Sequence, residues 1–503
     1  MAVNQIKLGA IISYVALFVN ILIGLVYTPW LITSIGKADY GLYTLAMSII
    51  SLLAFDFGLG SATTKFVSQF LAENRQDKVD RLMGTIYKLY LYIDIVILIV
   101  LGVLYFFLPK IYTGLTPEEL DKFSTIFLIA AFYCVISFPF IPQNGILTSY
   151  EKFVQLKLCD LFHKIFIVVS MSACLLLGYG LFALVIINAL SGILTIVLKQ
   201  LVISTGTPLK VVLTSCDKGE LKVIFTFTVW VTIAALAQRL IFNIAPSILG
   251  MFSDSQAIAV LGIAITLESY VYLFANALNG MFLPKVSRMM AGNDTNGILE
   301  LMIKVGRIQI YIIGFILLWL IAFGNHFINV WLDESYSLVY WSLLFIVLPS
   351  FIHLPQEIGL TYTIAANKVK QQSYIYILMG VINLVLAIPL TKLFGCLGLC
   401  FAIFVAYIFR TICLDVLFKR ELHLNIGRFF MESYIKLLVP LAIVLIVSIG
   451  INFIPISGWI GLIAKSLLFT ACFCVVMYAI GFNQYEKNLF LTPFIKIIKK
   501  IAI

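Results

Sequence analysis

Long apolar runs, separated by short polar segments, follow one another along the whole chain. Each run contains about 18 or more mostly apolar residues, the length that a helix needs to cross a lipid bilayer. The strands of a membrane barrel are shorter and alternate between apolar and polar positions, so they do not explain the pattern. The sequence therefore predicts an all-α polytopic membrane protein.

The pattern predicts fourteen transmembrane helices. They are expected at residues 9–33, 41–66, 87–108, 123–147, 158–177, 180–203, 222–250, 256–283, 301–324, 338–364, 373–391, 395–418, 431–453 and 457–482. Because fourteen is an even number, both ends of the chain should lie on the same side of the membrane. No loop between these helices is long enough for a separate soluble domain.

Composition and charge agree with this topology. Hydrophobic residues make up 62% of the chain, charged residues only 12%, and the mean hydropathy is +1.07, outside the range of soluble domains. The net charge is +10, and 28 lysines and arginines lie on the side of the N-terminus against 4 on the other side. By the positive-inside rule, both termini are expected in the cytoplasm, and the charge does not require a nucleic-acid partner.

An internal repeat is present at offsets between 213 and 219 residues. The matches are KFVSQFLAEN from Lys65 with KVSRMMAGN from Lys285, PQNGILTSYEKF from Pro142 with PQEIGLTYTIAANK from Pro355, and LLGYGLFAL from Leu176 with LFGCLGLCFA from Leu393. They map the first six helices onto the next six. We therefore predict two pseudo-symmetric six-helix lobes, 1–205 and 206–425, around a central cavity. Two additional helices, 426–482, and a basic amphipathic cytoplasmic tail, 483–503, would follow.

The stretch DFGLGSATTKFVSQFLAEN from Asp56, preceded by LITSIGKADYGLYTL from Leu31, resembles the first two helices of Wzx-type polysaccharide flippases. That family belongs to the multidrug/oligosaccharidyl-lipid/polysaccharide exporter superfamily. The resemblance implies a flippase in the bacterial inner (plasma) membrane that works by alternating access. Its substrate would be an oligosaccharide unit linked through pyrophosphate to a polyprenyl lipid, moved to the outer leaflet for O-antigen, capsule or lipopolysaccharide synthesis. Membrane lipids, a glycan polymerase and chain-length machinery are the partners that it implies.

Polar residues inside the predicted spans are candidate substrate contacts, because an intramembrane charge is costly unless it has a partner or a cavity. Arg239 and Asn243 share a face of the span 222–250, and an arginine fork suits a diphosphate or an acidic sugar. An ion pair between Arg239 and Glu268 is the structural alternative. The next span carries one polar stripe, which should face a wet cavity and is formed by Glu268, Tyr272, Asn276 and Asn279.

The span 158–177 begins with Asp160, His163 and Lys164, which are candidates for a first docking site for the diphosphate near the cytoplasmic surface. The alternative for Lys164 is that its side chain simply extends to the interface. On the span 9–33, Asn20 belongs to a polar seam with Ser13 and Tyr27, a pattern that helix packing also explains.

Asp56, beside Gly58 and Gly60, is a candidate ion-coupling or structural residue, and Glu268 is a second candidate for the same roles. The glycines loosen the helix or allow close packing, and Asp56 would then cap a break in the helix or pair with a nearby base. These alternatives stay open at the level of the sequence.

No enzymatic constellation, metal-binding spacing or Walker loop occurs in the sequence, so we expect a protein that is not an enzyme and has no cofactor. Uphill transport would then depend on coupling to H⁺ or Na⁺. Three other functions remain: an ion-coupled drug or small-solute antiporter, a peptidoglycan-precursor flippase, and a non-transporting scaffold of a glycan-assembly complex. The intramembrane Arg239 and Glu268 argue against the scaffold, which has no need of buried charge.

Overall fold

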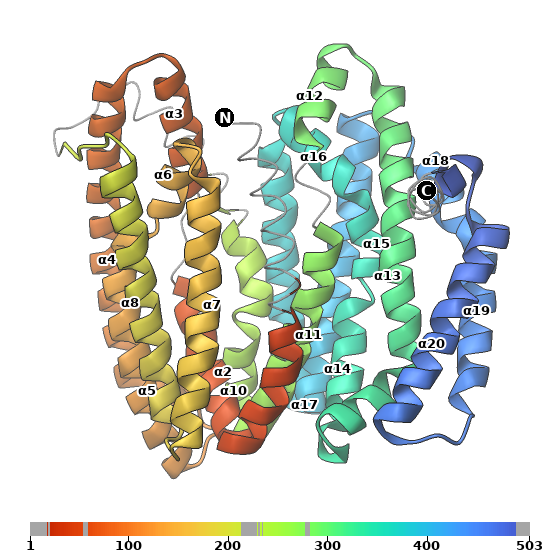
Figure 1. Cartoon of the computed structure of the whole chain (residues 1–503), viewed down its shortest axis with the longest axis horizontal. Helices are drawn as coiled ribbons and strands as arrows, with labels where there is room; N and C mark the ends of the chain where they lie inside the picture. Colours follow the sequence, from red (N-terminus) through yellow and green to blue (C-terminus); the bar gives the residue numbers. More distant parts are fainter. Residues whose placement is uncertain are drawn as a thin grey trace, which may run out of the picture. The chain divides into compact units, whose positions relative to one another are not determined.

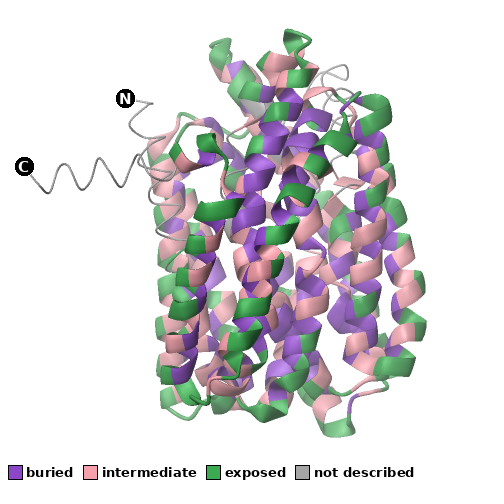
Figure 2. Cartoon of the chain, turned by 90° about the vertical axis from the view of Figure 1, so that its right-hand side faces the viewer, coloured by how far each residue is buried: buried purple, intermediate pink, exposed green. Residues whose placement is uncertain are grey.

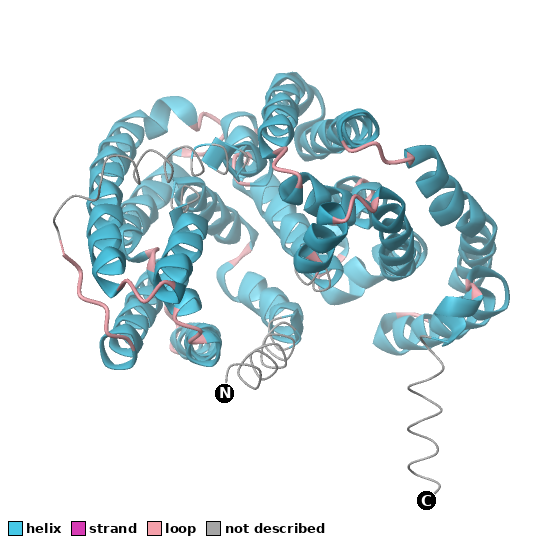
Figure 3. Ribbon diagram, turned by 90° about the horizontal axis from the view of Figure 1, so that it is seen from above, coloured by secondary structure: helices cyan, strands magenta, loops and turns pink. Residues whose placement is uncertain are grey.

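The computed structural model describes residues 18, 21–53, 59–212, 229, 232–233, 235–276 and 282–488. Within these ranges the regular elements are helices, and no strand occurs (Figure 3). Eleven of the described helices are long and apolar enough to cross a membrane, and the pair Ile21–Ile35 and Lys37–Leu53 passes the same test together. The predicted all-α membrane fold is confirmed.

The described helices come close to the fourteen predicted spans, and two of them need a separate account. The pair Ile21–Ile35 and Lys37–Leu53 bends by 116° at Gly36, which is too sharp for one straight span. The long element α17 (Val369–Glu421) contains one non-helical residue, Gly395, and is two helices joined at that point. When the bent pair is counted as one span and α17 as two helices, the described ranges contain thirteen candidate spans.

The chain packs as two compact units, of which unit 1 comprises Met1–Thr266 and Val369–Arg410. Its elements are α2 (Lys37–Leu53), α3 (Leu59–Ala72), α4 (Gln76–Ile111), α5 (Pro117–Ser137), η1 (Phe138–Phe140), α6 (Gln143–Ser149), α7 (Phe153–Leu176), α8 (Leu181–Gly206), α10 (Ala245–Phe252), part of α11 (Ser255–Asn276) and part of α17 (Figure 1). The helices α7 and α8 pack against each other, and α5 packs against α4 and α8.

Unit 2 comprises Leu267–Lys368 and Thr411–Ile503. Besides the remaining parts of α11 and α17 it contains α12 (Leu283–Ala291), α13 (Thr295–Trp331), η3 (Glu334–Tyr336), α14 (Ser337–Val347), α15 (Ser350–His353), η4 (Leu354–Gln356), α16 (Glu357–Ala365), α18 (Ile426–Phe430), η5 (Met431–Ile435), α19 (Lys436–Asn452), α20 (Gly458–Val476) and η6 (Met477–Gly481). The helix α13 packs against α14, α16, α19 and α20. These units are groups of packed helices, and the division into lobes at residue 205 stays a prediction.

Burial is distributed as expected for helices that face lipid on one side. Along single helices, exposed and buried residues lie on different faces (Figure 2). On α7, for example, Leu158, Phe162 and Ile165 are exposed, whereas Leu156 and Cys159 are buried. Exposed apolar side chains in this number are stable against hydrocarbon and unfavourable in water, so the surface fits a membrane protein.

The backbone repeats itself at the three matching sequence segments. Left-handed residues occur in pairs, which are Asn74 (φ 56°) and Asn293 (φ 53°), Glu151 and Asn367 (both φ 55°), and Gly178 (φ 83°) and Gly395 (φ 57°). The members of each pair are 219, 216 and 217 residues apart in the sequence. A left-handed residue ends a helix and redirects the chain, so the chain turns at corresponding points of the two halves.

Each half also breaks one span next to a proline. The span Pro117–Ser149 passes through the 3-10 turn η1 shortly before Pro142, and the span Glu334–Ala365 passes through η4, which contains Pro355. The residues after these prolines are Gln143 and Gln356, and each is only 2% exposed. Both breaks therefore bury one side-chain amide inside their own unit.

Candidate functional site

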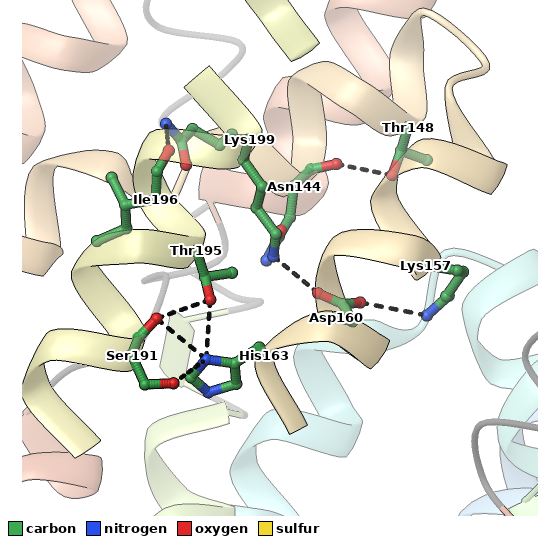
Figure 4. Close-up of polar contacts among 10 residues, drawn as sticks. Asn144, Thr148, Lys157, Asp160, His163, Ser191, Thr195, Ile196 and Lys199 are labelled. Carbon is green, nitrogen blue, oxygen red and sulfur yellow. Dashed lines mark hydrogen bonds and ion pairs between the residues drawn. The ribbon is translucent and has the colours of Figure 1, made fainter. Parts of the chain in front are cut away.

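Three helices of unit 1 bring polar side chains together (Figure 4). Lys199 on α8 donates from Nζ to Oδ1 of Asp160 on α7 at 2.8 Å and to Oδ1 of Asn144 on α6 at 2.9 Å. The Nζ of Lys157 lies 3.8 Å from the other carboxylate oxygen of Asp160. Because the Lys199 side chain is only 12% exposed, this charged group depends on its two partners and ties the three helices together.

His163 lies one turn further along α7 and faces α8. Its Nδ1 is 2.8 Å from Oγ1 of Thr195, 3.0 Å from Oγ of Ser191 and 3.3 Å from the backbone oxygen of Ser191. Either the hydroxyls donate to Nδ1 or Nδ1–H donates to the carbonyl, depending on the tautomer. These contacts occupy Nδ1, so Nε2 is the ring atom left for a substrate.

Lys164 lies on a different face of α7. Its side chain is exposed, and within the part of the chain that the structure describes it has no hydrogen bond or ion pair. Steps of four residues place it on one helical face with Val168 and Ser172. Those two residues line a cavity of about 420 Å³, together with Leu22, Ile23, Val26, Tyr27 and Trp30 of the helix Ile21–Ile35.

The cavity presents two aromatic rings. The ring centroids of Tyr27 and Trp30 are 5.8 Å apart, and the rings are tilted relative to each other. The Tyr27 hydroxyl is buried and has no hydrogen-bond partner among the described residues. The two aromatic rings give the cavity an apolar surface on which a sugar ring can stack.

Arg239 and Asn243 are both attached to the end of α2. Nη1 of Arg239 donates to the backbone oxygen of Ser51 at 2.6 Å, and Nδ2 of Asn243 donates to Oγ of Ser51 at 2.5 Å. Their common partner shows that the two side chains share a face of the span Ala235–Phe252. In this conformation the contacts hold α2 and that span together, so a substrate would have to compete with Ser51.

The other predicted site residues do not join this group. Glu268 and Tyr272 lie in the part of α11 that belongs to unit 2, and their exposed fractions are 8% and 44%. The two ends of the predicted stripe therefore have different surroundings. Asn276 is the last residue of α11 and its side chain is not described, while Asn20, Asp56 and Asn279 lie outside the described residues.

Sequence reasoning missed several members of the polar group, namely Asn144, Ser191, Thr195 and Lys199. Lys199 stands near the end of the predicted span 180–203, where a lysine is ordinarily explained by the cytoplasmic charge. A signal was present, since Ser191, Thr195 and Lys199 follow at steps of four and form one polar face of α8.

Metal binding has no support in the described ranges, because no group of three or more histidine, cysteine, aspartate or glutamate side chains is placed to hold an ion there. The polar group in unit 1 is instead rich in ammonium groups and hydroxyls. These are donors for an anionic and hydroxylated ligand.

Comparison with solved structures identifies the fold. The structure titled "Lipid II flippase MurJ, inward closed conformation" is 15% identical in sequence, with a TM-score of 0.67, and covers 98% of this chain and 99% of its own. A multidrug resistance MATE family transporter of the MOP superfamily in an inward-facing conformation is 14% identical, with a TM-score of 0.67 over 80% of this chain and 96% of its own.

A MOP superfamily transporter from Pyrococcus furiosus is 15% identical, with a TM-score of 0.58 over 86% of this chain and 96% of its own. At these identities the comparisons show a shared fold. A comparison with curated protein sequences gives no match.

A family model described as "Polysaccharide biosynthesis protein" matches residues 6–290, which is more than half of the chain. The match includes the helix Ile21–Ile35, α2 and α3, which carry the resemblance in the sequence, and also the polar group on α6, α7 and α8. The chain therefore belongs to the polysaccharide biosynthesis protein family.

Proposed function

We propose that the protein flips polyprenyl-pyrophosphate-linked oligosaccharide units from the cytoplasmic to the outer leaflet of a bacterial inner membrane, for cell-surface polysaccharide synthesis. It works by alternating access, and both termini lie in the cytoplasm. The observation that carries the proposal is the position of Lys164. This lysine shares a face of α7 with two residues of the cavity that contains Tyr27 and Trp30, and no partner among the described residues neutralises it.

The proposed substrate has a diphosphate next to sugars, and the site offers groups for both. Lys164 binds a phosphate oxygen through a charge-assisted hydrogen bond, which is strong where water is scarce. The rings of Tyr27 and Trp30 stack against a sugar. The polyprenyl chain stays in the bilayer, where it needs no polar partner.

Asp160 regulates how much positive charge the substrate meets. Its carboxylate holds Lys199 and lies near Lys157. A phosphate that reaches this group competes with Asp160 for the two ammonium groups, so binding exchanges one anion for another. That exchange avoids an unpaired buried charge in either state.

A peptidoglycan lipid precursor is the second candidate substrate, because the fold is shared over 98% of this chain with a structure titled as a lipid II flippase. The same lysine would serve such a substrate. An antiporter of cationic drugs is disfavoured, since the exposed Lys164 repels a cation beside the aromatic cavity.

The test uses the purified full-length protein in liposomes and a fluorescent undecaprenyl-pyrophosphate-linked N-acetylglucosamine as the probe. We expect Lys164→Ala to slow flipping about tenfold or more, because a hydrogen bond to a charged group contributes about 1.5–3 kcal/mol. Lys164→Arg should keep most of the activity, and Lys157→Ala, which leaves Lys199 paired with Asp160, should have a smaller effect than Lys164→Ala.

Equal flipping by the wild type and Lys164→Ala would contradict the proposed site. Transport of a cationic dye without any flipping of the lipid-linked probe would favour the antiporter instead. A clear preference for a probe that carries a peptide stem over the sugar-only probe would favour the peptidoglycan precursor.

A further inference from the structure

The buried glutamines after the two proline breaks have different partners. In unit 1, Nε2 of Gln143 donates to the backbone oxygen of Ile196 at 3.2 Å and to Oε1 of Gln200 at 3.0 Å, both on α8. This donor is therefore bonded within its own half. The contact joins the broken span Pro117–Ser149 to α8 through neutral groups only.

In unit 2 the equivalent contact contains a carboxyl group. The side-chain amide of Gln356 faces the carboxyl of Asp415 on α17. Asp415 lies 219 residues after Ile196, the same offset that relates Asn74 to Asn293. The glutamine of the second half thus faces a titratable carboxyl group, whereas the glutamine of the first half contacts a backbone carbonyl and a side-chain amide.

The surroundings of Asp415 do not neutralise a negative charge. Oδ1 of Asp415 and Nε2 of Gln356 are sealed from solvent and have no hydrogen-bond partner among the described residues. Tyr434 on η5 is near the carboxyl, but its hydroxyl lies 2.9 Å and 3.0 Å from the backbone oxygens of Phe351 and Ile352 and donates there.

No lysine, arginine or histidine in the described ranges forms an ion pair with Asp415. An ionised carboxylate in a membrane span costs several kcal/mol when it has no cation. The group must therefore bind a cation, and the simplest is a proton. A metal cation takes about six oxygen ligands in proteins, which is more than one carboxyl and one amide supply.

We propose that Asp415, with Gln356, is a proton-binding site of the second half, and that uptake and release of this proton couples transport to a proton gradient. Gln356 ends the break η4, so a change in the break moves the amide relative to the carboxyl and alters how well the proton is held. The coupling rests on the proposed flippase function, whereas proton binding does not.

Asp415→Asn tests the site, because it replaces the carboxyl by an amide and recreates the amide pair that Gln143 and Gln200 already form. In the infrared spectrum of the purified full-length protein at neutral pH, we expect one protonated-carboxyl signal to disappear in Asp415→Asn. Glu300→Gln, at an exposed glutamate, should leave the signal unchanged. Identical spectra of the wild type and Asp415→Asn would overturn the proposal. Should Asp415→Asn fold poorly, Asp415→Ser gives the same comparison.

The second measurement is flipping of the undecaprenyl-pyrophosphate-linked probe with and without a proton gradient. We expect Asp415→Asn to lose the acceleration by the gradient. Asp94→Asn, which alters another buried carboxyl with an unpartnered oxygen among the described residues, should keep it. If Asp94→Asn lost the acceleration by the proton gradient and Asp415→Asn kept it, the coupling through Asp415 would be overturned. Acceleration of the wild type by a sodium gradient and not by a proton gradient would overturn it too. Absence of flipping in the wild type would count against the proposed function, while the infrared result would still decide proton binding.

Discussion

Among single residues, the buried ion pair of Arg307 and Glu486 has the clearest consequence for stability. The two side chains are 6% and 1% exposed, and Nε and Nη2 of Arg307 donate to the two carboxylate oxygens of Glu486. Tyr311 also donates to Glu486 at 2.7 Å, and Nη2 of Arg307 donates to the backbone oxygen of Gly481. These hydrogen bonds hold the segment after α20 against α13.

We expect Glu486→Ala to lower the free energy of unfolding by about 3–5 kcal/mol, since it leaves a buried guanidinium without its anion. The matched control is Glu421→Ala, which removes an exposed pair with Lys368 and should change stability little. Thermal unfolding of the purified variants in detergent measures both. If both variants lost the same free energy of unfolding, burial of the Arg307–Glu486 pair would not be the source of its larger stabilisation.

The same pair predicts a pH dependence. Burial raises the pKa of the Glu486 carboxyl, but the bonds from Arg307, the backbone N–H of Asn483 and Tyr311 outweigh it and lower the pKa below its ordinary value. The stabilisation is therefore complete above the ordinary carboxyl pKa of about 4.3 and is lost as the pH falls through the lowered pKa. The difference in unfolding temperature between the wild type and Glu486→Gln should shrink below about pH 4.

The sequence identified some residues of the candidate site and not others for a physical reason. Asp160, His163 and Lys164 are near neighbours on one helix, so helical spacing alone brings them together. Lys199 joins them only because α7 and α8 pack side by side, and its distance along the chain gives no sign of that contact. The suggested pairing of Arg239 with Glu268 depends on the same kind of information and stays a prediction, while one contact of Arg239 is with the backbone of Ser51.

At the scale of elements, two glycines of unit 1 allow the turn between α10 and α11 to pack closely against them. A Cβ on Gly41 of α2 would lie 1.9 Å from the backbone oxygen of Ser255, and one on Gly114 would lie 2.3 Å from that of Ser253. The Ser255 hydroxyl also donates to the Glu119 carboxylate. The turn can approach this closely only because these two positions have no side chain.

We expect Gly41→Ala to destabilise the protein by about 1–3 kcal/mol, because the added methyl group meets a backbone atom that cannot move aside locally. Gly102→Ala on α4 is the control, since nothing lies within 4 Å of its Cβ position, and alanine there should stabilise the helix by about 0.5–1 kcal/mol. Unfolding temperatures of the two variants with the same sign of change would be evidence against the close approach.

Hydropathy predicted where helices cross the membrane better than where they begin and end. The predicted span 180–203 agrees closely with α8, Leu181–Gly206. By contrast, the span 87–108 corresponds to α4, which starts at Gln76. The first turns of α4 carry Asp77, Lys78 and Arg81 and remain helical outside the apolar run. Lysine and arginine are good helix formers, and an aspartate is favourable in the first turn of a helix.

For the whole molecule, the distribution of lysine and arginine predicts which loops face the cytoplasm. Asp77 and Glu118 lie near opposite ends of α4 and the following turn, and the first is expected inside and the second outside. In a cysteine-free background, an impermeant thiol reagent should label Glu118→Cys in intact cells and Asp77→Cys only after lysis. Labelling in the opposite order would reverse the predicted topology.

The repeat predicts two lobes, a division that stays a prediction, and the packing within each unit shows which helices touch. The helix α10, which belongs to the second half, is assigned to unit 1, where it packs against α2 of the first half. Sequence similarity records common origin, but contacts depend on the conformation that a chain adopts. The division of the chain at residue 205 therefore could not reveal which helices touch.

The paired left-handed residues also carry information about how the two halves diverged. Asparagine occupies one such position in both halves. At another position, Glu151 of the first half corresponds to Asn367 of the second, and both have the same backbone angle φ. A glutamate is a strained choice in this region of backbone space, where asparagine and glycine are tolerated best. The backbone angle is thus the same at two corresponding positions whose side chains differ. An alignment of the two halves that is based on the left-handed positions should therefore find more corresponding residues than one based on sequence identity.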